Sequence, residues 1–120
     1  MPNIVRNIGV ASQIGSYSDA IEVPAGARWL FTSGTPGLGL DGALPGDVGG
    51  QAELAWGHII RALDAAGMTV HDLVKVTHYL LHEEDIPDYV KVRSRFLGEA
   101  RPASMLLTGA GLVRSEFLLE

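Results

Sequence analysis

The sequence contains no cysteine, so it can hold neither a disulfide framework nor a thiolate metal site. Aromatic residues are scarce, at 7% of the chain. No apolar run approaches the roughly 20 residues that a membrane-spanning helix needs. The first residues, Met1 to Arg6, lack the apolar core of a signal peptide. These absences predict a cytoplasmic protein without a membrane partner.

Basic residues are also few, because nine Lys and Arg stand against fourteen Asp and Glu and the formal net charge is −5. The only local concentration is Lys91, Arg93 and Arg95, which do not all share one face of a helix. Binding a nucleic-acid backbone requires several phosphates to be neutralised from one basic surface. Nucleic acid is therefore not expected as a partner.

What the chain does have is enough apolar material for one core. Its 120 residues are 47% hydrophobic and 19% charged, which is typical of a folded domain and excludes disorder. The length predicts a single domain over residues 1–120. A stretch rich in glycine and proline at 36–46 predicts a surface loop.

Two helices are predicted from their end signals. Asp47 as N-cap and Gly67 as C-terminal stop bound the first. The second begins after Asp85, with Pro87 in its first turn, and ends at Gly98. Apolar residues recur every three or four positions along the first helix: Val48, Ala52, Ala55, Ile59, Ile60, Leu63 and Ala66.

Strands account for the rest of the predicted fold. They are expected at 5–10, 19–23, 29–33, 73–81, 103–108 and about 116–120, from alternation and from aromatic and β-branched content. The order is β-β-β-α-β-α-β-β. This order predicts an α+β domain with a mixed sheet and two helices on one face. The early strands should be antiparallel, and the strands joined through a helix should be parallel.

Apolar residues on both faces of the sheet predict self-association. Met105 and Leu107 oppose Leu106, and Trp29 and Phe31 share one face. Two helices can cover only one face, and an exposed apolar sheet is an aggregation hazard. We therefore expect a homo-oligomer whose sheets pack inward, with periodicity leaving dimer and trimer both open.

Most familiar catalytic patterns are absent. The four histidines lack the spacing of a helical ligand pair, so no metal is expected. No phosphate-binding glycine loop and no serine in a nucleophile elbow occur, so no cofactor and no catalytic residue is assigned. His78 fits a core or interface position. Tyr17, Ser33 and Gly34 lie in a loop and at a strand end, where turns and pocket linings are equally common.

Several short motifs, in order along the whole chain, resemble the Rid family of reactive-intermediate deaminases, also called the YjgF type. They are Ile14-Gly15-Ser16-Tyr17, Phe31-Thr32-Ser33-Gly34, Leu63-Asp64-Ala65-Ala66-Gly67, Asp72-Leu73-Val74-Lys75-Val76-Thr77 and Arg101-Pro102-Ala103.

This resemblance implies a chorismate-mutase-like fold in which three subunits pack their sheets into a central barrel, with small-molecule clefts between neighbours. Active members hydrolyse imines or enamines such as 2-aminoacrylate to a ketoacid and ammonia, without metal or cofactor. By the same resemblance, Tyr17, Ser33 and Gly34 line the pocket.

The chain departs from the family pattern at Ser104, where active members place an arginine that grips the substrate carboxylate. A serine hydroxyl supplies no fixed positive charge, so Arg93 on the second helix is a candidate substitute. The last residues, Leu118-Leu119-Glu120, resemble only the start of the family's final strand, which carries a functional glutamate. The expected function is a deaminase (a hydrolase) of altered specificity, or else a non-catalytic ligand-binding or protein-stabilising module of the same fold.

Overall fold

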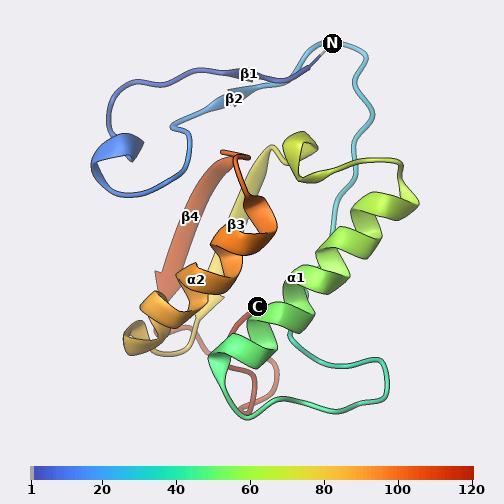
Figure 1. The fold of residues 1–120 in the computed structure, drawn as a ribbon, viewed down its shortest axis with the longest axis vertical. Helices are drawn as coiled ribbons and strands as arrows, with labels where there is room; N and C mark the ends of the chain where they lie inside the picture. The colour runs from blue at the N-terminus through green and yellow to red at the C-terminus, as the bar shows by residue number, and fades with distance from the viewer. Residues whose placement is uncertain (1) are drawn as a thin grey trace.

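Two helices packed on a pair of parallel strands form the centre of the structure, a computed structural model that describes residues 2–120 (Figure 1). Both helices lie on the same face of the strand pair, so the predicted α+β class is confirmed. The elements are β1 (Ile4–Val5), η1 (Ala11–Gln13), β2 (Ile21–Glu22), α1 (Val48–Ala65), η2 (Val70–Asp72), β3 (Lys75–Leu80), η3 (Glu83–Asp85), α2 (Ile86–Leu97) and β4 (Ala103–Thr108).

The first helix begins and ends where the sequence predicts. The Asp47 side chain accepts a hydrogen bond from the Gly50 N–H at 3.1 Å. At the other end, Gly67 adopts a φ of +69°, which a side chain would disfavour. The N–H groups of Gly67 and Met68 then bond to the Asp64 and Leu63 carbonyls, at 3.0 and 2.9 Å. These bonds satisfy carbonyls that a helix end leaves unpaired.

The second helix follows the prediction with one difference. It begins at Ile86, includes Pro87 in its first turn, and stops at Gly98, whose φ is +56°. Asp85 occupies the N-cap position, but its side chain makes no capping hydrogen bond. Its backbone is already in the helical region, because the short η3 leads directly into α2.

The strands β3 and β4 are parallel and joined through α2, as expected for a helix-crossed pair. Their register places Val76 opposite Ser104 and His78 opposite Leu106. Alternate residues of β3, including His78 and Leu80, are buried beneath the helices. The buried core they join also contains Val48, Ala52, Ala55, Trp56, Tyr89, Val92, Leu97, Ala100 and Leu119.

The first two strands are antiparallel, as predicted, but shorter than predicted. They pair only at Ile4 with Glu22 and Val5 with Ile21. The chain curls away after Arg6 because the Asp19 carboxylate accepts three backbone hydrogen bonds. The donors are the N–H groups of Ile8 at 2.9 Å, Gly9 at 3.2 Å and Ala11 at 2.8 Å. Bonds from Ile8 and Ala11 contribute most to lowering the pKa of the Asp19 carboxyl.

The strand predicted at 29–33 is wrong in this structure. That segment is not part of any ladder, because a cavity separates it from β3. The strand predicted at 116–120 is reduced to a single bridge between Leu119 and Leu80. Around it, Tyr79 and Glu120 exchange two backbone hydrogen bonds, at 2.9 and 3.0 Å. The observed order is thus β-β-α-β-α-β.

A buried glutamine holds the C-terminal segment in place. The Gln51 side chain is only 1% exposed. Its amide nitrogen donates to the Pro45 and Glu116 carbonyls, at 2.9 and 3.2 Å, and its oxygen accepts from the Leu118 N–H at 2.8 Å. Gly37 packs against the same turn of α1, where an added Cβ would lie 2.2 Å from the Gln51 carbonyl oxygen. Loop 36–46, α1 and the C-terminal segment therefore meet at Gln51.

Among residues 2–120, no helix is both long enough and apolar enough to cross a membrane.

Candidate functional site

A large cavity lies between segment 28–35, α1 and β3, and has a volume of about 690 Å³. Ser33 and Gly34 line it together with Glu120. A Cβ built on Gly34 would lie 3.0 Å from a Glu120 carboxylate oxygen, so this carboxylate rests against the glycine backbone. Ser33 and Gly34, which were predicted for the site, thus line it together with the Glu120 carboxylate, to which the sequence alone assigned no role.

A second, shallower depression of about 440 Å³ contains Tyr17 and Arg101. Ser18 fixes the position of this loop, because its N–H bonds to the Pro102 carbonyl at 3.2 Å and its hydroxyl donates to the Arg101 carbonyl. The Arg101 side chain donates to the carbonyls of Gly98 and Ala100, at 2.8 and 2.9 Å. A guanidinium held by backbone carbonyls and a tyrosine thus line the same depression.

Ser104 belongs to a buried hydrogen-bonded chain that joins β3, β4 and both helices. Its hydroxyl lies 2.9 Å from Nε2 of His78. The Nδ1 atom of His78 bonds to the Tyr89 hydroxyl, which also accepts from the Trp56 indole N–H at 3.3 Å. Because the Tyr89 oxygen already accepts from Trp56, its own proton is available for Nδ1. Nε2 then carries the imidazole proton and donates to Ser104.

Burial keeps the hydrogen-bonded side chains of His78 and Tyr89 uncharged at neutral pH. Desolvation, assisted by the nearby Arg93 guanidinium, lowers the pKa of His78 from 6.5 to about 4. Desolvation likewise raises the pKa of Tyr89 to about 12. At neutral pH the imidazole and the phenol are therefore both neutral, and His78 holds the core position predicted for it.

Arg93 packs against the same group of residues. Its guanidinium carbon lies 5.7 Å from the centre of the Tyr89 ring, a cation–π arrangement. Neither Arg93 nor Ser104 lines the two cavities described above. The five residues predicted to bind substrate therefore lie in three separate places within a single subunit. Ser33 and Gly34 line the large cavity, Tyr17 lines the second depression, and Arg93 and Ser104 lie by the His78–Tyr89 pair.

Sequence patterns missed Glu120, Arg101 and Tyr89. In the sequence, Glu120 and Arg101 stand out only as parts of segments that resemble family motifs, and Tyr89 belongs to none of these segments. The sequence does hold a signal for the contact between Tyr89 and His78. A buried tyrosine hydroxyl needs a polar partner, and His78 is the titratable residue predicted to lie in the core.

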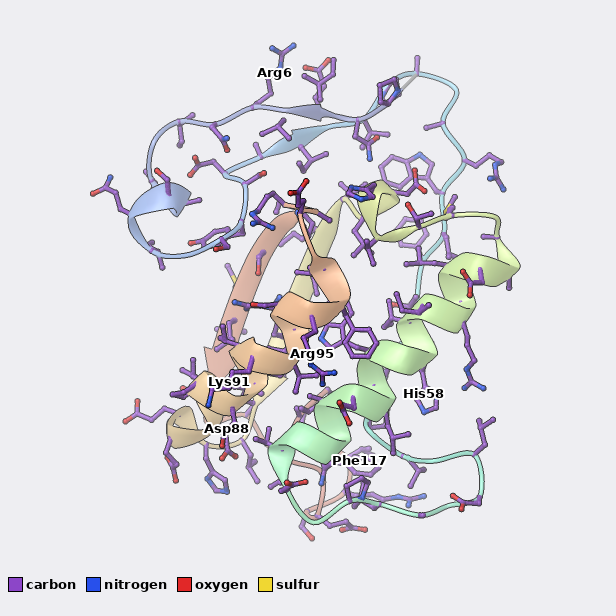
Figure 2. The ribbon with its side chains drawn as sticks, viewed as in Figure 1. Arg6, His58, Asp88, Lys91, Arg95 and Phe117 are labelled. Carbon is purple, nitrogen blue, oxygen red and sulfur yellow. The ribbon has the colours of Figure 1, made fainter. Side chains whose placement is uncertain are left out.

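The histidines are dispersed. On the outer side of α1, His58 Nε2 lies 2.7 Å from the Leu38 carbonyl (Figure 2). Across the exposed side of the helix pair, Arg95 of α2 pairs with Glu53 of α1 (Figure 2). Over residues 2–120, no group of three or more His, Asp or Glu side chains is arranged to hold a metal ion.

The fold defines a small α+β protein with a cavity between segment 28–35, α1 and β3. Residues 9–120 match the family model described as endoribonuclease L-PSP. The chain belongs to this family, the Rid or YjgF-type proteins.

Two relatives show how much of the chain is shared. A RutC family protein from Pyrococcus horikoshii is 30% identical over 107 residues, which is 86% of this chain and 81% of the relative. The protein TdcF of Escherichia coli, whose name describes it as a reactive intermediate deaminase, is 28% identical over 100 residues, or 82% of this chain and 75% of TdcF.

Solved structures agree on the fold. A Rid family protein from Yersinia pestis superposes with a TM-score of 0.83 over 99% of this chain and 94% of that one, at 20% identity. A crystal structure of E. coli TdcF with bound serine superposes with a TM-score of 0.71, at 28% identity, over 88% of this chain and 84% of TdcF.

Proposed function

We propose that this chain forms a homotrimer around a central barrel, with clefts between its copies that bind a small amino-acid-derived metabolite. The reaction proposed there is hydrolysis of an imine or enamine to a carbonyl compound and ammonia, without metal or cofactor. The observation that carries this proposal is the Glu120 carboxylate, which lies against Gly34 and beside Ser33 at the wall of the large cavity.

Imine hydrolysis needs a base that orients and deprotonates water as it attacks the carbon of the C=N bond. The proton reaches the nitrogen, and ammonia leaves as the carbonyl forms. A carboxylate beside a glycine backbone suits the first step, because the missing side chain lets a small substrate approach closely. The Ser33 hydroxyl supplies a nearby donor or acceptor for the nitrogen or the water.

Association between copies follows from where the remaining residues lie. Tyr17 and Arg101 line one cavity, whereas Ser33, Gly34 and Glu120 line another. One chain alone does not bring the two sets together. A cleft formed by two copies would allow the two cavities to contribute to one site.

The uncovered face of the sheet supports the same association. Tyr79 pairs with Leu107 in the β3–β4 register, and both are exposed on the face away from the helices, as is Met105. On the neighbouring segment, Trp29 stacks on Phe31 at 6.0 Å, and Phe31 is 84% exposed. Further copies of the chain would bury this apolar surface.

Altered specificity follows from Ser104. Its hydroxyl bonds to His78, so this position offers no cation to a substrate carboxylate. Of the two arginines nearby, Arg101 lines the Tyr17 depression, whereas Arg93 packs on the Tyr89 ring. We expect Arg101 to attract a carboxylate from this different position, which favours substrates of a different length from 2-aminoacrylate.

Ammonia release from imines tests the reaction. The imines are 2-aminoacrylate, made from serine by a dehydratase, and those made from leucine, phenylalanine and glutamate by amino-acid oxidases. We expect faster release than in buffer for at least one, and a loss on the order of 100-fold in Glu120→Gln, the usual contribution of a general base. The control, Glu99→Gln, changes an exposed carboxylate after α2 and is expected to leave the rate unchanged. Equal rates in Glu120→Gln and wild type would refute the role of Glu120.

Ser104 also favours a second candidate, a non-catalytic ligand-binding or protein-stabilising module. Without an arginine guanidinium at position 104, a ligand can still bind while the reaction is lost. Calorimetric titration with serine and with the matching ketoacids separates the two. Saturable binding without acceleration of any imine supports the module and contradicts the deaminase.

Self-association is tested by mass. The single chain is 12.8 kDa, and light scattering in dilute buffer should report three times that value. Leu107→Glu places a charge on the uncovered sheet face and should lower the mass toward 12.8 kDa. Lys91→Glu, on the exposed side of α2, should not. A wild-type mass of one chain would contradict the trimer and the cleft together.

A further inference from the structure

The loop that carries Tyr17 leaves β1 at Asn7 and returns to the same place at Asp19. The Asp19 N–H donates to the Asn7 side-chain oxygen at 3.1 Å, and the Asp19 carboxylate accepts from three N–H groups that follow Asn7. A short loop whose two ends lie together is an Ω loop, a kind that often carries functional residues. This Ω loop, residues 7–19, contains η1 and lies away from both helices (Figure 1).

Apolar packing does little to hold the Ω loop. Its large apolar side chains, Ile8, Val10 and Ile14, are between 51% and 78% exposed. Within the loop only Ala11 and Ser18 are buried, and both are small. A segment that buries so little apolar surface is ordered mainly by its hydrogen bonds. The bonds at the two ends of the loop therefore decide its conformation.

The Asp19 side chain suits this role because a carboxylate accepts at both of its oxygens. One oxygen accepts from the N–H groups of Ile8 and Gly9, and the other accepts from Ala11. The bonds from Ile8 and Ala11 lower the pKa of the Asp19 carboxyl below its ordinary 3.8, so the group is ionised at neutral pH. Hydrogen bonds to an ionised acceptor are about twice as strong as those between neutral groups. An asparagine has a single acceptor oxygen and cannot serve both sides.

The position of Tyr17 depends on both ends of the Ω loop. Ser18 attaches the end of the loop to the two residues before β4, through its N–H and its hydroxyl. A Cβ built on Gly15 would lie 3.5 Å from two carbons of the Tyr17 ring, so the ring rests against that glycine. The ring is thus supported by the part of the loop whose path Asp19 sets.

We infer that Asp19 is a positioning residue of the proposed site: by holding the start of the Ω loop, it keeps Tyr17 in the depression that Arg101 lines. The inference rests on the proposed function, in which Arg101 attracts the substrate carboxylate. Glu120, the proposed base, lies in the other cavity. Loss of Asp19 should therefore weaken substrate binding and leave proton transfer unchanged.

Asp19→Ala tests this role in the imine assay. We expect KM to rise about tenfold while kcat stays within about twofold of wild type, because the lost interaction contributes equally to the bound substrate and the transition state. Asp19→Asn should give an intermediate KM, since it keeps one acceptor oxygen. The control is Asp41→Ala, which removes an exposed carboxylate that accepts from the Ala43 N–H at 2.9 Å in loop 36–46. It should change neither constant.

A fluorine spectrum reads the position of Tyr17 without turnover. The protein is made with 3-fluorotyrosine, and the Tyr17 resonance is assigned from its absence in Tyr17→Phe. In Asp19→Ala this resonance should move toward its position in the urea-unfolded chain. The resonances of Tyr79 and Tyr89 should stay where they are, and Asp41→Ala should move none of the three.

Three outcomes overturn the inference about Asp19. They are an unmoved Tyr17 resonance in Asp19→Ala, a fall in kcat at unchanged KM, and an effect of Asp41→Ala as large as that of Asp19→Ala. A wild type that hydrolyses no imine contradicts the proposed reaction instead. Calorimetric titration with serine then decides, because the Kd should rise about tenfold in Asp19→Ala. An equal Kd in the two proteins, or no serine binding to wild type, overturns the inference as well.

Discussion

Gln51→Leu is expected to lower the free energy of unfolding by about 3–5 kcal/mol. The leucine fits the buried space but leaves the Leu118 N–H and the Pro45 and Glu116 carbonyls without their partner. Each buried polar group left unpaired costs about 1–3 kcal/mol. Urea unfolding at fixed protein concentration measures the loss, which is a large part of the 5–15 kcal/mol typical of a domain.

Two further variants separate lost hydrogen bonds from lost packing. Gln13→Leu removes an exposed amide that donates to the Gly9 carbonyl at 2.7 Å, and should cost less than about 1 kcal/mol. Gln51→Glu keeps the acceptor for Leu118 but loses both donors when ionised, so its defect should shrink as pH falls and the carboxyl protonates. A Gln51→Leu defect no larger than that of Gln13→Leu would contradict the assigned role.

The same substitution should reach the candidate site. Gln51 fixes Leu118, and two residues later Glu120 lies against Gly34. Once the C-terminal segment is released, the carboxylate loses its position at the cavity wall. We therefore expect Gln51→Leu to lose any imine hydrolysis even at temperatures where it remains folded.

Acidification from pH 7 to pH 4 is expected to cost wild type about 3 kcal/mol more stability than it costs His78→Gln. The pKa of His78 is lowered from 6.5 to about 4 by burial and by Arg93. Between these values the unfolded chain binds the proton and the folded chain does not, so stability falls as pH falls. The contribution is fully present above pH 6.5 and is lost as the pH drops through 4.

The groups that face His78 explain why it resists protonation. Tyr89 and Ser104 occupy its two ring nitrogens, Trp56 lies 6.3 Å from its ring centre, and Arg93 is the nearby charge. A glutamine can replace both hydrogen bonds but does not titrate in this range. Urea unfolding from pH 7 to pH 4 compares the two proteins.

A second histidine provides the control. His82 is exposed at the start of η3, and His82→Gln should follow the wild-type pH dependence. Parallel curves for wild type and His78→Gln would show that the buried imidazole protonates as readily when folded as when unfolded.

Helix ends and strands that depend on residues close together in the sequence were predictable. The ends of α1 follow from Asp47 and Gly67, and β4 lies at the predicted residues 103–108. The prediction at 5–10 failed because Asp19, a dozen residues away, draws the chain into a loop. The strand at 29–33 failed because β-branched and aromatic content favours an extended backbone but does not supply a partner.

The candidate site was predictable only in part. Ser33 and Gly34 were recognisable from a strand end and a family motif, and both line the large cavity. Glu120 was not assigned, because its meeting with Gly34 joins residues far apart in the chain. The bond between Ser104 and His78 likewise requires the parallel register of two strands separated by a whole helix.

The sequence by itself determined the helices, the two central strands, the α+β class and the family, because periodicity, caps and glycine stops act over a few residues. Only the tertiary structure decided which strand edges are paired, that Gln51 anchors the C-terminal segment, and which site residues share a cavity. Those outcomes depend on contacts between distant residues, whose free energy exists only once the chain has folded.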